Sequence, residues 1–125
     1  MSTPKNIWIV DDSATILASV AGVLQSAGHE PRTFLRADGV LGELRASGPP
    51  HLIITDLNMP EMDGISLIRE IRRIPTCRFV PILMLTTESQ QDKRAEAKAA
   101  GATGWLVKPI SAENLQGVLH RVLPG

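Results

Sequence analysis

The sequence predicts an α/β fold in which one doubly wound parallel sheet carries helices on both faces. Five short apolar runs alternate strictly with five stretches whose apolar residues recur at helical spacing. The runs are almost continuously apolar, which is typical of strands buried on both faces. Parallel strands need crossover helices, and the alternation supplies a helix after every strand.

The first two strand–helix pairs have clear boundaries. Residues 7–10 are a short apolar strand, and the helix after it begins at its cap, Ser13, and ends at Gly28. Residues 31–35 form a weaker strand whose opening proline favours an edge position or a strand start. The second helix covers 37–46, and a Ser-Gly-Pro-Pro stretch ends it.

The remaining three pairs follow the same pattern. A buried strand over 52–55 leads to Asp56, and a helix over 65–74 is ended by proline. Strands are expected over 81–85 and 105–107. The helices after them are expected from a cap at Ser89 to Ala100, with Gly101 as stop, and from a cap at Ser111 to Val122.

Composition indicates one ordinary globular domain over residues 1–125. Apolar residues make up 43% of the chain, and 13 basic residues balance 13 acidic ones, so no net field attracts nucleic acid or a membrane surface. The single Cys77 has no partner for a disulfide. No signal peptide or long apolar run is present, so we expect a cytoplasmic protein. We also expect it to be a monomer.

Five polar residues directly follow the apolar runs. They are Asp11 and Asp12 after the first strand, Asp56 after the third, Thr86 after the fourth and Lys108 after the fifth. Sites in such sheets lie outside the carboxyl ends of the strands. Adjacent strands lie roughly 5 Å apart, so we expect these groups to converge at one edge.

The chemistry of this set follows from its charge. Carboxylates 4 Å apart repel by about 4 kcal/mol at an effective dielectric constant near 20, so three of them need a cation. Oxygen ligands without His or Cys favour a hard ion, and few protein ligands suit Mg²⁺. Asp56 can then act as a nucleophile towards phosphorus, and Lys108 and Thr86 can hold the phosphoryl oxygens.

These residues and their neighbours resemble the receiver domain of bacterial two-component response regulators over essentially the whole chain. The resemblance implies a flavodoxin-like (βα)5 fold with strand order 2-1-3-4-5. The matching motifs are Val10-Asp11-Asp12-Ser13, Thr55-Asp56-Leu57-Asn58-Met59-Pro60, Met62-Asp63-Gly64, Leu85-Thr86-Thr87-Glu88 and Trp105-Leu106-Val107-Lys108-Pro109.

The resemblance also implies roles for individual residues. Asp56 would accept a phosphoryl group from a histidine kinase. Asp11, Asp12, Asp56 and the backbone carbonyl of Asn58 would hold Mg²⁺. Thr86 and Lys108 would contact the phosphoryl group, and Lys108-Pro109 would be a cis peptide bond. The chain would promote only its own phosphorylation and dephosphorylation, and would not be an enzyme acting on other substrates.

Within the family the sequence is similar to the stand-alone, CheY-like chemotaxis regulators. The face built by the fourth helix, the fifth strand and the fifth helix would then signal to a flagellar motor switch protein or another target, and a phosphatase would be a further partner. Thr86 and Trp105 would act as the switch, with Trp105 where the family usually has Tyr or Phe. Asn58 and Glu88 would tune the phosphoryl lifetime.

Other interpretations remain open at this stage. A receiver could serve a phosphorelay or kinase feedback outside chemotaxis, or be a fragment of a larger hybrid protein. A haloacid-dehalogenase-like phosphatase would need a second Asp at position 58, where Asn58 stands. A flavodoxin-like cofactor binder would need a phosphate-binding loop where Asp11 and Asp12 would repel phosphate.

Several charged residues are predicted to have solvated or packing roles. The three histidines are scattered and match no catalytic spacing. The basic residues of the third and fourth helices are expected on solvated faces, although those of the fourth helix lie on the expected signalling surface. The residues are His29, His51, His120, Arg69, Arg72, Arg73, Lys93, Arg94 and Lys98.

Overall fold

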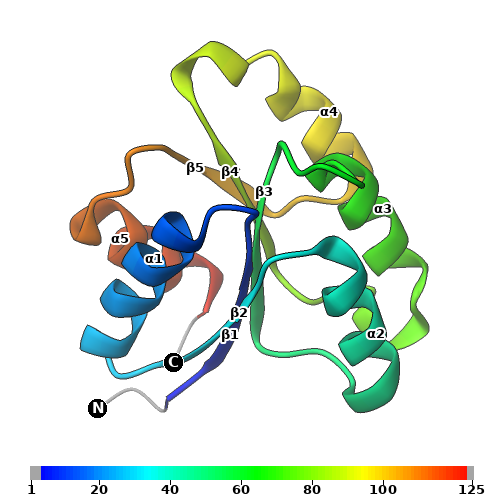
Figure 1. Cartoon of the computed structure of the whole chain (residues 1–125), viewed down its shortest axis with the longest axis horizontal. Helices are drawn as coiled ribbons and strands as arrows, with labels where there is room; N and C mark the ends of the chain where they lie inside the picture. Colours follow the sequence, from blue (N-terminus) through cyan, green and yellow to red (C-terminus); the bar gives the residue numbers. More distant parts are fainter. Residues whose placement is uncertain (1–3, 124–125) are drawn as a thin grey trace.

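The computed structural model describes residues 4–123, apart from the side chain of Glu88. Five parallel strands form one sheet in the order β2-β1-β3-β4-β5 (Figure 1), which confirms the predicted fold. The strands are β1 (Asn6–Val10), β2 (Glu30–Phe34), β3 (Leu52–Asp56), β4 (Ile82–Thr86) and β5 (Gly104–Val107). The helices are α1 (Ala14–Ser26), α2 (Ala37–Ser47), α3 (Gly64–Arg73), α4 (Lys93–Ala100) and α5 (Ala112–Val122), with short 3₁₀ helices η1 (Pro75–Cys77) and η2 (Glu88–Gln90).

The sheet separates two hydrophobic cores. Successive strand residues point to opposite faces, so Ile7 and Ile9 pack with α1 and α5, whereas Trp8 and Val10 pack with α2 and α3. Figure 1 shows α1 and α5 on one side of the sheet and α2, α3 and α4 on the other. All five residues of β3 are buried. The central strand is therefore covered on both faces, as its apolar run predicts.

Two of the three predicted serine caps are confirmed. The Ser13 hydroxyl accepts the N–H of Ile16 at 3.3 Å, and the Ser111 hydroxyl accepts the N–H of Asn114 at 3.0 Å. Each cap satisfies an N–H that the first helical turn leaves free.

The predicted cap at Ser89 is wrong. Thr87 caps the short helix η2 instead, because the Gln90 side chain accepts the Thr87 N–H at 2.8 Å and closes a capping box. The Ser89 hydroxyl contacts the Thr87 hydroxyl at 2.9 Å, and α4 begins only at Lys93. The connection from β4 to α4 is consequently a 3₁₀ turn and not the first turn of a long helix.

The other boundaries differ from the predictions by one or two residues. Strand β2 covers Glu30–Phe34, and Leu35 lies beyond it with 55% of its surface exposed. Helix α1 ends one residue earlier than predicted, and Gly28 follows it with φ 89°. That left-handed conformation carries little cost for glycine, so Gly28 is a suitable stop.

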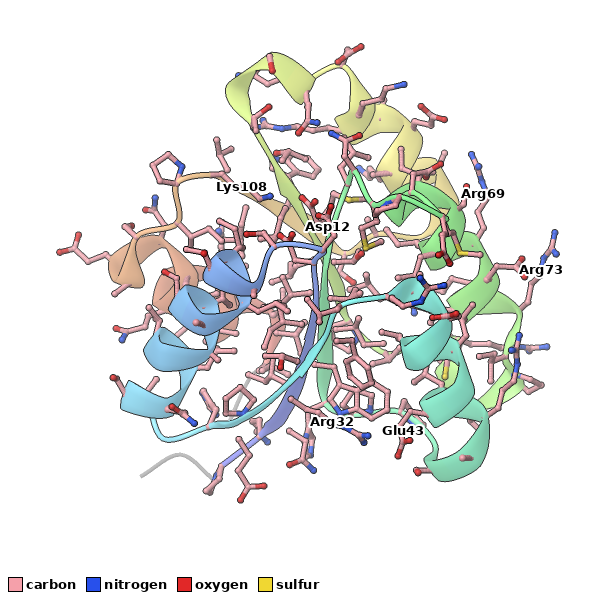
Figure 2. All side chains as sticks on the ribbon, viewed as in Figure 1. Asp12, Arg32, Glu43, Arg69, Arg73 and Lys108 are labelled. Atoms are coloured by element: carbon pink, nitrogen blue, oxygen red, sulfur yellow. The ribbon has the colours of Figure 1, made fainter. Side chains whose placement is uncertain are left out.

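Arg72 does not lie on a solvated face. Its guanidinium donates to the carbonyls of Gly101 at 2.7 Å, Val80 at 2.7 Å and Cys77 at 3.0 Å. These bonds join the α3–β4 connection to the end of α4. Arg69 and Arg73 do point away from the molecule (Figure 2), as predicted.

Among residues 4–123, no helix is both long and apolar enough to span a bilayer.

Candidate functional site

Three carboxylates meet at the carboxyl ends of β1 and β3. One oxygen from each of Asp11, Asp12 and Asp56 lies within 4.8 Å of the others. Asp11 is 1% exposed and Asp56 is 6% exposed, whereas Asp12 faces solvent. The register explains the convergence, because β1 and β3 are neighbours in which Val10 pairs with Thr55. The sheet therefore brings together the three aspartates that the sequence predicts for this edge.

The backbone around Asp11 holds its side chain in place. The Asp11 N–H donates to the carbonyl of Phe34, which extends the pairing of β1 with β2 by one residue. One Asp11 carboxylate oxygen accepts the N–H of Ser13 at 2.9 Å, an Asx-type turn that starts α1. Asp11 therefore faces the site with one oxygen already hydrogen-bonded.

Lys108 reaches the cluster from the end of β5. Its Nζ donates to Asp56 Oδ1 at 2.7 Å and to Asp11 Oδ2 at 3.3 Å. Figure 2 shows Lys108 and Asp12 at the same edge of the sheet. The Lys108 N–H donates to the Thr86 carbonyl at 2.7 Å, and the Lys108–Pro109 peptide bond is cis. Residues almost a hundred positions apart thus form one charged network.

Burial and charge compete in setting the protonation of this network. Burial lowers the pKa of Lys108, but the hydrogen bond and charge of Asp56, followed by those of Asp11, outweigh it and raise this pKa overall. Burial raises the pKa of Asp11, the Ser13 N–H opposes that rise, and the neighbouring Asp56 charge adds to it. The pKa of Lys108 is therefore held above its ordinary value, and the pKa of Asp11 is raised although the charge and hydrogen bond of Lys108 oppose that rise.

Gly64 supports the loop after Asp56. A Cβ built at this glycine would collide with the carbonyl oxygen of Asp56 and lie 3.0 Å from the sulfur of Met84. The Gly64 N–H donates to the carbonyl of Leu57 at 2.7 Å. The start of α3 consequently packs directly against the end of β3, and this close approach requires a residue without a side chain.

The comparison with known protein families favours a receiver domain over the phosphatase and the cofactor binder that the sequence left open. The model of the response regulator receiver domain matches residues 7–120. The chain belongs to this family.

Known relatives align with almost the whole chain. This chain is 34% identical to the chemotaxis protein CheY of Pseudomonas aeruginosa, over 93% of this chain and 94% of that protein. The structure of the Vibrio cholerae chemotaxis protein CheY4 is 41% identical, has a TM-score of 0.90 and covers 97% of this chain and 100% of that one. A putative response regulator from Chloroflexus aurantiacus is 29% identical, with a TM-score of 0.92 over 98% of this chain and 100% of that one.

Three further site residues were predicted: Thr86, Asn58 and Glu88. Thr86 is buried, and its hydroxyl donates to the Leu106 carbonyl at 3.5 Å, a long and weak bond. Asn58 is exposed in the loop after β3. The side chain of Glu88 lies outside the described part of the structure. The hydroxyl of Thr86 is therefore weakly held beside β5.

The guanidinium of Arg94 partly covers Trp105, a contact that the sequence does not predict. Trp105 is 37% exposed as a residue, and the guanidinium carbon of Arg94 lies 5.0 Å from the centre of its ring. The Nε of Arg94 is buried without a hydrogen-bond partner. Arg94 therefore connects α4 to β5 and is not on a purely solvated face. Tryptophan and arginine eleven residues apart on different elements give no periodic signal that would predict this contact.

The donor set of the receiver domain fits a hard divalent cation. The three clustered carboxylates supply only oxygen atoms, and no histidine or cysteine belongs to the group. Such ligands prefer Mg²⁺ or Ca²⁺ over Zn²⁺, and a small number of protein ligands leaves positions for the waters that Mg²⁺ keeps. Receiver domains typically use Mg²⁺ at this acidic site, and the residues present suit it.

Proposed function

We propose that this receiver domain is a phosphorylation-activated switch whose phosphoacceptor is Asp56. The position of the Asp56 carboxylate is the main support. It is almost fully buried, lies beside two further carboxylates and accepts a hydrogen bond from Lys108 at 2.7 Å. A carboxylate held in this way has a fixed direction of attack and a cation beside the position that phosphoryl oxygens would occupy.

The reaction is a transfer from a phosphohistidine of a histidine kinase. An oxygen of Asp56 bonds to phosphorus while the bond from phosphorus to the imidazole nitrogen breaks, and that nitrogen keeps the electron pair. The product is an aspartyl phosphate. Lys108 is already bonded to Asp56 Oδ1, so it is close enough to pair with the new negative charge.

Mg²⁺ would be held by Asp11, Asp12, Asp56 and the backbone carbonyl of Asn58. When bound, the ion supplies positive charge that offsets repulsion between the carboxylates and the incoming phosphoryl oxygens. Asp12 is solvent-exposed while Asp11 is buried, so the metal site has an open side from which a phosphodonor can approach.

The signal would be read on the face of α4, β5 and α5. The Thr86 hydroxyl has only a weak bond to Leu106, so a phosphoryl oxygen competes well for it. Hydrogen bonds to charged groups contribute about 1.5–3 kcal/mol, which is as large as a typical allosteric coupling. Moving Thr86 changes the space beside β5, and Trp105 would relay that change to the surface. Asn58 and Glu88 would tune how long the phosphoryl group persists.

The output we propose is control of a flagellar motor switch protein in chemotaxis. The names of the relatives from Pseudomonas aeruginosa and Vibrio cholerae support this choice. The test compares binding of the purified switch protein to this chain with and without beryllofluoride and Mg²⁺. We expect tighter binding of the loaded form. Equal binding of the two forms would indicate that the activated chain acts on a partner other than the motor switch protein.

Phosphorylation of Asp56 is tested with a small phosphodonor such as acetyl phosphate. With Mg²⁺, the intact mass should show one phosphoryl group per chain, and Asp56→Asn should show none because the nucleophile is gone. Asp63→Asn is the matched control, since Asp63 is an exposed helix cap and Asn caps equally well. Labelling of Asp56→Asn at the level of the unmodified chain would overturn the proposal.

A further inference from the structure

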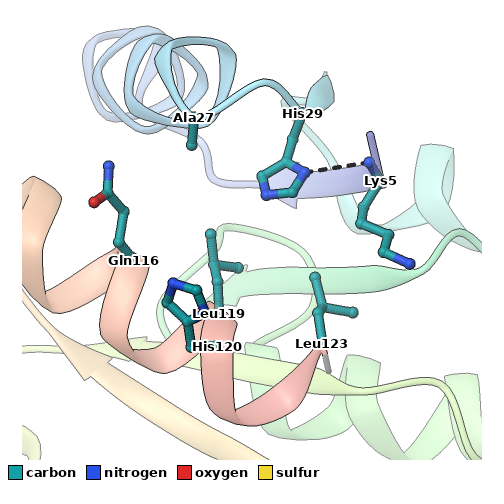
Figure 3. Close-up of a pocket in the computed structure, with 7 residues that line it drawn as sticks. All are labelled: Lys5, Ala27, His29, Gln116, Leu119, His120 and Leu123. Carbon is teal, nitrogen blue, oxygen red and sulfur yellow. Dashed lines mark hydrogen bonds between the residues drawn. The ribbon is translucent and has the colours of Figure 1, made fainter. Parts of the chain in front are cut away.

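A cavity lies near the amino ends of β1 and β2, at the opposite end of the strands from Asp56. Its volume is about 280 Å³. Lys5, which borders it, directly precedes β1, whereas Asp11 follows the same strand. Figure 3 shows the cavity between the end of α1 and the last turns of α5. The lining residues are Lys5, Ala27, His29, Gln116, Leu119, His120 and Leu123.

The hydrogen bonding of His29 fixes what its ring can offer to a ligand. The backbone N–H of Lys5 donates to His29 Nδ1 at 3.2 Å. Nδ1 must therefore be unprotonated, and the proton of the neutral ring is on Nε2. A protonated Nε2 has no lone pair for a metal ion. His29 is consequently a hydrogen-bond donor towards the cavity and not a metal ligand.

The rest of the polar lining also favours donors. Figure 3 shows the rings of His29 and His120 on opposite walls, with Gln116 beside His120. Lys5 adds an ammonium group, and no Asp or Glu is among the described residues that line the cavity. Burial lowers the pKa of His29, and the charge of Lys5 lowers it further. Among the described lining residues, Lys5 therefore carries the permanent positive charge, and no carboxylate of the lining balances it.

Several carbonyls at the end of α1 already have backbone partners. Val23 and Leu24 accept from Ala27, Leu24 also accepts from His29, and Gln25 accepts from Gly28. Leu119, which is buried, and Leu123 form an apolar wall beside the donors. A complementary ligand therefore carries an anionic group at one end and an apolar body at the other.

We propose that this cavity binds a small organic anion. Its carboxylate or phosphate group would accept hydrogen bonds from His29, His120 and Lys5, and its apolar part would pack on Leu119. The inference does not depend on phosphorylation of Asp56, since the two sites lie at opposite ends of the strands.

The test is an NMR titration of the isotopically labelled full chain in Mg²⁺-free buffer. The probes are phenyl phosphate and benzoate, with neutral benzyl alcohol and inorganic phosphate as comparisons. We expect saturable shifts of the His29, Gln116 and His120 amides with the two aromatic anions. The relative affinities of phenyl phosphate and benzoate distinguish a phosphate site from a carboxylate site. Asp56→Asn should leave these shifts unchanged.

Two variants test the donor set. His29→Asn keeps an acceptor for the Lys5 N–H but loses the Nε2 donor, and it should weaken binding about tenfold. Gln116→Glu places a carboxylate at the exposed rim without reducing helix propensity, and it should weaken binding at least as much. Lys98→Gln, on α4, changes the net charge by the same unit and should have no effect.

Two results would overturn the proposal. Benzyl alcohol binding as well as benzoate would make the cavity a purely apolar pocket. Shifts that do not saturate, or that persist unchanged in Gln116→Glu, would show that the anions only associate with the general surface.

Discussion

Lys108 determines how the acidic cluster is balanced. It is bonded to both Asp56 and Asp11, while the third carboxylate, Asp12, is left to solvent. Removing one partner of a buried charge pair leaves the other charge uncompensated, and this unpaired charge accounts for most of the destabilisation. The side chain of Lys108 is still partly exposed, so solvent reduces the cost.

Lys108→Ala should therefore destabilise the metal-free protein by about 1–3 kcal/mol. The loss should become smaller when Mg²⁺ is added, because the ion then neutralises Asp56 and Asp11. Urea unfolding with and without Mg²⁺ measures both values. Lys98→Ala, an exposed lysine on α4, is the control. An equal loss of unfolding free energy with and without Mg²⁺ would show that the ion does not compensate for the missing lysine charge.

His29 makes stability depend on pH with a definite sign. Burial, and then the charge of Lys5, lower the pKa of His29 in the folded chain below its ordinary value of 6.5. The unfolded chain therefore binds a proton more readily, and stability falls as the pH drops below about 6.5 and through the folded value. The stability that the neutral ring contributes is fully present above that range.

The variant His29→Asn isolates this contribution. The variant should be less stable than the unmodified chain. The difference between their free energies of unfolding should be largest at pH 7.5 and should decrease towards pH 5. Urea unfolding at several pH values checks this. A gap that widens on acidification would mean that the fold favours the charged imidazole.

At the scale of elements, the site depends on how closely α3 approaches β3. Gly64 opens α3 and lies against the carbonyl of Asp56, where the backbone leaves no space for a methyl group. The sequence shows Asp63-Gly64 as a loop motif, but it does not show which backbone atom the glycine contacts. This contact exists only once the strand and helix have packed.

Gly64→Ala should consequently displace the Asp56 loop, reduce stability by about 1–3 kcal/mol and slow phosphorylation. Gly22→Ala is the matched control, because Gly22 lies in α1 with no atom within 4 Å of a built Cβ. That change should stabilise the chain by about 0.5–1 kcal/mol. Thermal unfolding and the rate of labelling by acetyl phosphate report both effects. If the two substitutions changed stability and labelling rate similarly, the close packing at Gly64 would not be the cause.

Helix ends show where local signals are sufficient and where they are not. Ser13 and Ser111 cap as predicted, because each has an extended backbone directly before its helix and its hydroxyl accepts a first-turn N–H. Ser89 fails because Thr87 and Gln90 form a capping box two residues earlier. Arg72 and Arg94 were misplaced because their partners, a set of loop carbonyls and Trp105, come from distant segments.

For the whole molecule, alternation of apolar runs and helical stretches was enough to predict the fold. A parallel sheet places every strand's carboxyl end at one edge, so Asp11, Asp56 and Lys108 could be grouped before any distance was known. The distances themselves depend on register and side-chain conformation. The cavity near His29 was unpredictable for the same reason, since it unites the start of β1 with the ends of α1 and α5.

The central claim is that Asp56 carries the phosphoryl group, and chemical mapping tests it most directly. Borohydride reduces an aspartyl phosphate to homoserine, which mass spectrometry of peptides locates in the sequence. After treatment with acetyl phosphate and Mg²⁺, the account predicts homoserine at position 56 alone, and none when Mg²⁺ is replaced by a chelator. Homoserine at another aspartate, with position 56 unchanged, would contradict it.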